Sequence, residues 1–218
     1  MKLLVYAIAR SAPRGKLGVG VQREALAVRA HGGLVSIVGK VASSPRITEE
    51  SLYAHDRIVR RIAARTSAAL PMRFGSTVVD ESALERFVEE RRGEFVQALS
   101  KVRGCEQFTL RVFVDASRAL ERPTLCTDGP GARYLRARAE SHFPPEIAQL
   151  RALLAPLVKD ERAEAHDVPP LVASVYHLVP RASRAAYRAL YARGVQELAS
   201  ARVALSGPWP TYAFAESA

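Results

Sequence analysis

Hydrophobic residues recur along this chain at two spacings, which predict strands in some segments and helices in others. Short apolar runs that alternate or are rich in β-branched residues predict strands, and they occupy Leu3–Ala9, Leu26–Ala30, Leu34–Val41, Phe108–Val114, Pro170–Val179 and Ala201–Leu205. Apolar residues three or four positions apart predict helices after Thr48, after Asp80, over 146–158 and after Ser183. Gly32 and Gly33 separate two of the strand segments, and this predicts a hairpin turn.

The first predicted helix has a clear beginning. Thr48 is a suitable N-cap, and Glu49 and Glu50 then lie in the first turn, where negative charge is favourable. We expect Pro71 to end this helix. Its predicted inner face consists of Leu52, His55, Val59, Ile62, Ala63, Thr66 and Leu70.

The second predicted helix runs without interruption to Gly104. Either Asp80 or Ser82 caps it, and Ser82 with Glu85 is a candidate capping box. Its predicted apolar face consists of Leu84, Phe87, Val88, Phe95, Leu99 and Val102. The charged run Glu89–Arg92 is predicted to be its solvated side, and the run Lys159–Asp167 is predicted to be a loop.

Strands return after each predicted helix, which indicates an α+β fold of two small domains, each a sheet covered by helices on one face. A Gly- and Pro-containing stretch at 116–132 interrupts the pattern. We therefore expect a first domain at 1–103, a second α+β domain with additional helices at 104–206, and a C-terminal tail at 207–218.

Composition narrows the class of protein. With 48% hydrophobic and 25% charged residues, the 218-residue chain can form packed cores. The net charge of +10 favours an acidic protein, nucleic acid or anionic surface as partner, although the arginines are dispersed along the chain. No apolar run approaches the roughly 20 residues of a membrane-spanning helix, so we expect a soluble, cytoplasmic protein with no membrane partner.

No arrangement of residues predicts a catalytic or metal site. Cys105 and Cys126 form no CxxC motif and have no nearby pair of histidines. Gly18-Val-Gly20 lacks the rest of a phosphate-binding loop. We therefore predict no cofactor, no metal and no enzymatic activity. One alternative stays open, in which His55, Asp56 and Arg73 converge in one pocket of an enzyme.

Two uncommon strings give the chain a family resemblance. Leu70-Pro-Met-Arg-Phe-Gly-Ser-Thr-Val78 resembles the Leu-Pro-hydrophobic-Arg-Phe-Gly-Thr signature of the gas vesicle protein F/L family (GvpF/GvpL), with Pro71, Arg73, Phe74 and Gly75 in the matching positions. Ser206-Gly-Pro-Trp-Pro-Thr-Tyr-Ala-Phe214 resembles its C-terminal Gly-Pro-Trp-Pro-Pro-Tyr-x-Phe, and the matching residues include Gly207, Pro208, Trp209 and Pro210. Thr211 and Ser76 depart from these patterns.

Three further segments extend the resemblance. Gly131-Ala-Arg-Tyr-Leu-Arg-Ala-Arg138 is similar to the family's Gly-x-x-Tyr-Leu-x-x-Arg and supplies Tyr134 and Leu135. Gly104–Val112 is similar to its Gly-x-Glu-hydrophobic-x-Val-x-Val segment, and His55-Asp56 to the His-Glu/Asp before the first signature.

The resemblance implies a modified ferredoxin-like N-terminal domain, a second α+β domain, and a part in gas vesicle assembly. It implies as partners the small hydrophobic shell protein and other gas vesicle accessory proteins, and a location in the cytoplasm and the gas vesicle. Three hypotheses follow: an assembly or minor structural protein, a basic nucleic-acid-binding module, and an enzyme built around His55, Asp56 and Arg73. The family signatures support the first hypothesis, whereas only the net charge supports the second.

Overall fold

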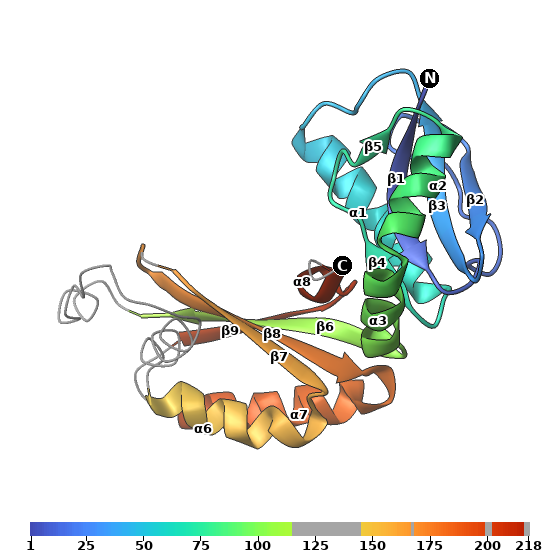
Figure 1. Ribbon diagram of the computed structural model, residues 1–218. Coiled ribbons are helices and arrows are strands. Elements are labelled where there is room, and N and C mark those ends of the chain that lie inside the picture. Colours follow the sequence, from blue (N-terminus) through green and yellow to red (C-terminus); the bar gives the residue numbers. More distant parts are fainter. Residues whose placement is uncertain (115–144, 167, 199–201, 216–218) are drawn as a thin grey trace, which may run out of the picture. The chain divides into compact units, whose positions relative to one another are not determined.

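The computed structural model describes residues 1–114, 145–166, 168–198 and 202–215. The chain forms two compact units, one of Met1–Glu106 with Trp209–Ala218 and one of Gln107–Pro208. Each unit combines a β-sheet with α-helices (Figure 1). The predicted α+β class is therefore confirmed.

The first sheet is built around its N-terminal strand. It contains β1 (Lys2–Ala9), β2 (Leu26–His31), β3 (Leu34–Val41), β4 (Ala69–Pro71) and β5 (Thr77–Val78). The order is β2-β3-β1-β4, with β5 also paired to β1, and these pairings are antiparallel. Gly32 and Gly33 form the predicted two-residue turn, with φ angles of 52° and 95° that glycine adopts readily.

Helices cover both faces of the first sheet, whereas we predicted helices on one face only. The helices are α1 (Glu49–Ala64), α2 (Glu81–Glu90), α3 (Arg92–Val102) and the short C-terminal α8 (Tyr212–Ala215). Ile58 and Ile62 of α1 share a core cluster with Leu4 of β1. The next residue back, Leu3, points to the opposite face and is buried too. The helices α2 and α3 contact β2, β4 and β5.

The first helix begins as predicted and ends earlier. The backbone N–H of Ser51 donates to Thr48 Oγ1 at 3.2 Å, and the Thr48 N–H donates to Ser51 Oγ at 3.0 Å, a reciprocal cap. The helix stops at Ala64 rather than at Pro71, because residues 69–71 pair with β1 as an edge strand instead. Leu52 is 44% exposed, so it is not on the inner face.

The second predicted helix is two helices joined at Arg91. The φ and ψ of Arg91, −107° and 13°, lie outside the helical region. The Arg91 guanidinium lies 5.6 Å from the ring centroid of Phe87 and 5.1 Å from that of Phe95. Asp80 is the cap, since its Oδ1 accepts from the Ala83 N–H at 2.8 Å. The candidate capping box at Ser82 therefore does not form.

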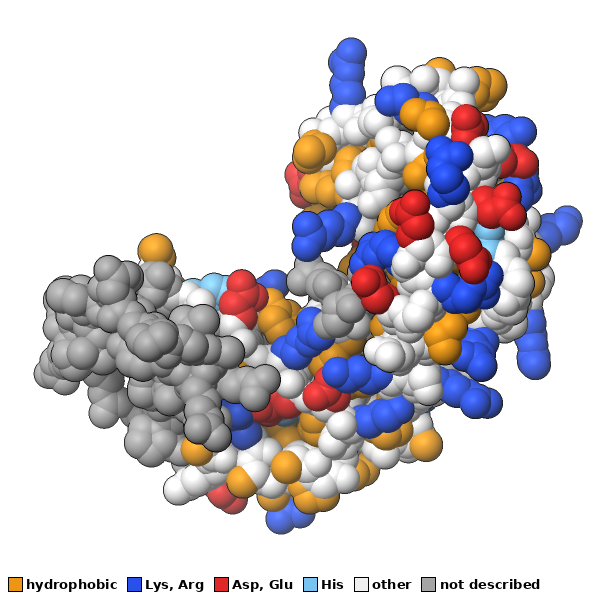
Figure 2. All heavy atoms as spheres, in the orientation of Figure 1, with side chains coloured by type: hydrophobic (Ala, Val, Ile, Leu, Met, Phe, Trp, Pro, Cys, Tyr) orange, Lys and Arg blue, Asp and Glu red, His pale blue; other side chains and the backbone are white. Residues whose placement is uncertain are grey.

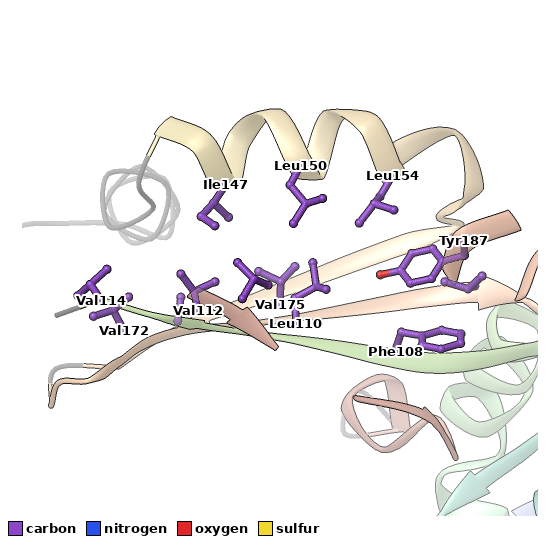
Figure 3. Close-up of a cluster of buried hydrophobic side chains, with 13 residues drawn as sticks. Phe108, Leu110, Val112, Val114, Ile147, Leu150, Leu154, Val172, Val175 and Tyr187 are labelled. Carbon is purple, nitrogen blue, oxygen red and sulfur yellow. The ribbon is translucent and has the colours of Figure 1, made fainter. Parts of the chain in front are cut away.

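The second unit has a four-stranded sheet in the order β7-β8-β6-β9. Its elements are β6 (Cys105–Phe113), α6 (Pro145–Leu154), η1 (Ala155–Leu157), β7 (Asp160–Ala165), β8 (Leu171–Pro180), η2 (Arg181–Ser183), α7 (Arg184–Gly194), η3 (Val195–Glu197) and β9 (Arg202–Trp209). The helices α6 and α7 lie side by side on one face of this sheet (Figure 1). Ile147, Leu150 and Leu154 point from α6 toward the apolar side chains of β6 and β8 (Figure 3).

One prediction for this unit was wrong. The charged segment predicted to be a loop contains β7, which pairs antiparallel with β8. Because β7 is an edge strand with exposed positions, charged side chains are compatible with it. Val195 and Leu198 follow the end of α7, and both pack against the core of this unit.

A chain of polar side chains crosses the core of the second unit. Arg151 Nη2 donates to Glu161 Oε1 at 2.5 Å, and His177 Nε2 lies 2.8 Å from Glu161 Oε2. The other ring nitrogen, His177 Nδ1, lies 2.7 Å from the hydroxyl of Tyr187. Burial alone would raise the pKa of Glu161, but the hydrogen bonds from His177 and Arg151 outweigh it and lower that pKa to about 2. The network therefore depends on an ionised Glu161.

Candidate interaction site in the first unit

The segment that follows β4 is a turn held against β1 by backbone hydrogen bonds. The Met72 N–H donates to the Tyr6 carbonyl at 3.0 Å, and the Val5 N–H donates to the Ser76 carbonyl at 2.8 Å. Between these, the Ser76 N–H donates to the Arg73 carbonyl at 3.1 Å, and Gly75 has a φ of 81°. Glycine at the third position of such a turn relieves strain that a Cβ would cause. Phe74 precedes it and is half-buried.

His55 supports this turn from α1. Its ring stacks on Tyr6 at 5.4 Å between centroids and meets the edge of Phe74 at 5.5 Å. Its Nε2 donates to the Met72 carbonyl at 3.2 Å. Burial lowers the pKa of His55, which favours the neutral ring. Among the described residues, its buried Nδ1 has no hydrogen-bond partner. We interpret His55 as a packing residue that fixes the backbone at Met72.

The C-terminal segment packs onto the same part of the first unit. The Thr211 hydroxyl donates to the Ala69 carbonyl of β4 at 3.2 Å. The Tyr212 hydroxyl donates to Asp56 Oδ1 at 3.2 Å, and burial together with this carboxylate raises the pKa of Tyr212. Phe214 is fully buried. Residues more than 130 positions apart in sequence are thus brought together.

Trp209 and Asp56 share one arginine. The Arg60 guanidinium carbon lies 4.0 Å from the Trp209 ring centroid, a cation–π geometry, and Arg60 Nε donates to Asp56 Oδ2 at 2.5 Å. Asp56 therefore accepts from Arg60 and Tyr212 with its two oxygens. This ties the indole of the C-terminal signature to α1.

A cavity of about 250 Å³ lies between the two signature segments within the first unit. Its lining is Leu70, Pro71, Met72, Arg73, Ser76, Arg91, Phe95, Tyr212 and Ala215. Two arginines thus meet a largely apolar floor. Two guanidinium groups above this floor suit binding of a small apolar and anionic group. Among the lining residues that the structure describes, none form a nucleophile–base pair.

Comparison with known proteins identifies the family of this chain. A family model described as "Gas vesicle synthesis protein GvpL/GvpF" matches residues 2–216. The chain belongs to the GvpL/GvpF family.

Relatives and solved structures of this family extend over almost the whole chain. "Gas vesicle protein F" from Streptomyces sp. (strain CB03234) is 26% identical, over 99% of this chain and 100% of the relative. "Gas vesicle protein L" from the same strain is also 26% identical, over 97% of this chain and 91% of the relative. Equal identity to both leaves the F and L types undistinguished.

Two crystal structures share the fold. GvpF from Microcystis aeruginosa superimposes with a TM-score of 0.79 over 98% of both chains, at 14% identity. GvpF from Anabaena sp. PCC7120 gives a TM-score of 0.77 over 98% of this chain and 95% of that chain, at 15% identity. At such identities the likeness shows the GvpF fold and nothing finer.

The structure gathers only some of the predicted GvpL/GvpF signature residues. Pro71 and Arg73 line the cavity, and Phe74 and Gly75 form the adjoining turn. Trp209 and Pro210 belong to the first unit with them. In contrast, Gly207 and Pro208 belong to the second unit, where Arg188 Nη2 donates to the Gly207 carbonyl at 2.6 Å. Tyr134 and Leu135 lie outside the described residues.

Sequence reasoning missed three side chains of this site. Arg91 was assigned to a solvated helix face and Phe95 to the core alone, yet both line the cavity. Arg60 was not singled out, although it joins Asp56 to Trp209. The available sequence signal was Gly93, because a glycine inside a helical pattern lowers the expectation of one uninterrupted helix.

The two alternative hypotheses gain no support from the described residues. His55 and Asp56 bond to different partners, so they do not form a catalytic pair. Figure 2 shows basic and acidic side chains interspersed on the visible face of the first unit, rather than a basic surface of the kind nucleic acids require. Within the described residues no three metal-ligating side chains group together, and no helix is long and apolar enough to cross a membrane.

Proposed function

We propose that this protein acts in gas vesicle assembly by binding the small hydrophobic shell protein and other vesicle accessory proteins during nucleation or wall growth. The role is that of a chaperone-like or minor structural component and involves no catalysis. Membership of the gas vesicle synthesis family supports the process. The proposed partner interactions go further than that membership.

One observation carries the proposal. The two strings that mark the family are far apart in sequence, yet Arg73 of the first and Tyr212 of the second line the same cavity. Their convergence beside exposed and half-buried aromatic and basic side chains is typical of a protein-binding site.

The physical logic of assembly fits such a site. A shell protein that associates through apolar surface aggregates when that surface is exposed before incorporation. A partner with a small apolar cavity and flanking cations can hold one element of the shell protein without covering the whole of it. Trp209 is half-buried and held by Arg60, so it presents a rigid aromatic edge at low entropic cost.

Co-expression of this chain with the shell protein of its source organism tests the proposal. We expect the two proteins to co-purify, and expect Arg73→Ala and Trp209→Ala each to reduce the recovered shell protein severalfold. Arg57→Ala is the matched control, because Arg57 is exposed on α1 and does not line the cavity. Clean separation of the wild-type pair, or equal recovery with all three variants, would contradict the proposal.

A further inference from the structure

We propose that the cavity beside β4 binds a carboxylate side chain of a partner peptide together with the apolar side chain next to it. The inference rests on the proposed function, in that the partner is a gas vesicle protein. It adds the chemistry of the bound segment: an acidic residue adjacent to an apolar one. The occupant is therefore a short acidic–apolar peptide and not a free anion.

Two guanidinium groups supply the charge complementarity. Arg73 is exposed at the turn and Arg91 joins α2 to α3, and both line the cavity. Arg91 Nε donates to Glu94 Oε2 at 2.9 Å, while its terminal amino groups have no acceptor among the described residues. Arginine recognises carboxylates through paired N–H donors, so these groups suit a second carboxylate. The carboxylate of Glu94 is the acidic group that competes for Arg91.

The floor of the cavity requires an apolar neighbour in the ligand. Leu70 and Pro71 are buried on β4, and Phe95 is buried on α3, so the surface below the arginines is hydrocarbon. An inorganic anion or a sugar-phosphate backbone would leave this floor uncovered. A peptide that places an apolar side chain beside its carboxylate covers the floor and reaches the arginines together.

The size of the cavity fits side chains rather than a cofactor. At about 250 Å³ it is smaller than the roughly 300–1,000 Å³ of drug-sized ligand sites. One or two side chains are the ligands that match this volume. The walls are also preorganised, since β4 pairs with β1 and the 73–76 turn is closed by its own hydrogen bond. Little ordering of the protein is then needed on binding.

An array of 12-residue peptides that covers the vesicle proteins of the source organism tests this inference. Each peptide is paired with a copy in which Asp and Glu are replaced by Asn and Gln. We expect the wild-type protein, at 0.15 M salt, to bind a subset of peptides that contain an acidic residue next to an apolar one. We expect the amide copies of those peptides to bind at least tenfold more weakly.

Variants of the full chain locate the contact. Arg73→Gln with Arg91→Gln should weaken binding of the same peptides at least tenfold, whereas the exposed Arg57→Gln should leave it unchanged. Circular dichroism of the double variant checks that the fold persists. If the double variant unfolds, the comparison of the acidic peptides with their amide copies on the wild-type protein still tests the inference. Absence of bound peptides, or equal binding of the amide copies, overturns the inference.

These outcomes are separable from those of the co-purification test. If shell protein co-purifies equally with the wild-type chain and with Arg73→Gln/Arg91→Gln but is lost with Trp209→Ala, shell-protein binding stands and the cavity inference is wrong. If carboxylate-dependent peptides bind but the shell protein does not co-purify with the wild-type chain, the cavity inference stands and shell-protein binding is wrong.

Discussion

The hydrogen-bonded network of Arg151, Glu161, His177 and Tyr187 in the second unit gives a sharp prediction for Glu161→Gln. Glutamine has nearly the same shape, so the change removes the charge with little change in packing. It leaves Arg151, whose side chain is 24% exposed, without its anionic partner, and His177 without a carboxylate acceptor. We expect the second unit to be destabilised at neutral pH.

The magnitude follows from the lowered pKa of Glu161. The shift from 4.5 to about 2 corresponds to about 3 kcal/mol, at about 1.36 kcal/mol for each pKa unit. Because the pKa is lower in the folded state, this stabilisation is complete above about pH 5 and declines as the pH falls toward 2. At pH 3 less than half of this stabilisation remains. Glutamine keeps part of the hydrogen bonding, so we expect a loss of about 2–3 kcal/mol at pH 7.

Urea unfolding measures this loss, with circular dichroism and tryptophan fluorescence recorded together. Trp209 is the only tryptophan and belongs to the first unit. A shift seen by circular dichroism with unchanged fluorescence therefore assigns the loss to the second unit. The difference between wild type and variant should shrink between pH 5 and pH 3.

Glu164→Gln is the matched control for this experiment. Glu164 lies on the same strand and accepts from the Tyr176 hydroxyl at 2.9 Å, but it is exposed. We expect a change within about 0.5 kcal/mol. If Glu161→Gln behaved like this control, or if its effect were independent of pH, the claim that ionised Glu161 stabilises the second unit through Arg151 and His177 would be refuted.

Further predictions concern the first unit, all measured by urea unfolding. In a double-mutant cycle, Arg60→Met and Trp209→Leu should show a coupling energy of about 0.5–1 kcal/mol from the cation–π contact, and additive effects would argue against it. Gly75→Ala should destabilise the first unit by about 1 kcal/mol, because Gly75 has a φ of 81°. Gly93→Ala should stabilise it by about 0.5–1 kcal/mol, because Gly93 is exposed in α3 with open space around it. Effects of the same sign would contradict this reasoning. Asp80→Ala should cost about 1 kcal/mol through loss of the α2 cap, and a neutral result would mean that the cap contributes nothing.

Local patterns predicted the elements whose signals are local. The Gly32–Gly33 turn and the Thr48 cap follow from adjacent residues, and both were found. The break at Arg91 was missed, because the apolar spacing continues across it and no proline marks it. β7 was missed because an edge strand tolerates charges that otherwise indicate a loop.

The site could be predicted only in part. The family strings identified Arg73 and Trp209, but no local rule places Tyr212 against Asp56, 156 residues away. Such contacts depend on how separate elements pack, and sequence periodicity does not encode them. Arg91 was missed for the same reason, since its role arises from the α2–α3 junction and not from its neighbours in sequence.

Gas vesicle formation in a heterologous bacterial host that carries the vesicle genes of the source organism tests the central claim most directly. Vesicles would be counted by electron microscopy with this gene present, with it removed, and with it replaced by Arg73→Ala/Trp209→Ala or by the control Arg57→Ala. The account predicts vesicles with the wild-type gene and the control, and a severalfold loss both without the gene and with the double variant. Normal vesicle numbers without the gene, or with the double variant produced at wild-type levels, would contradict it.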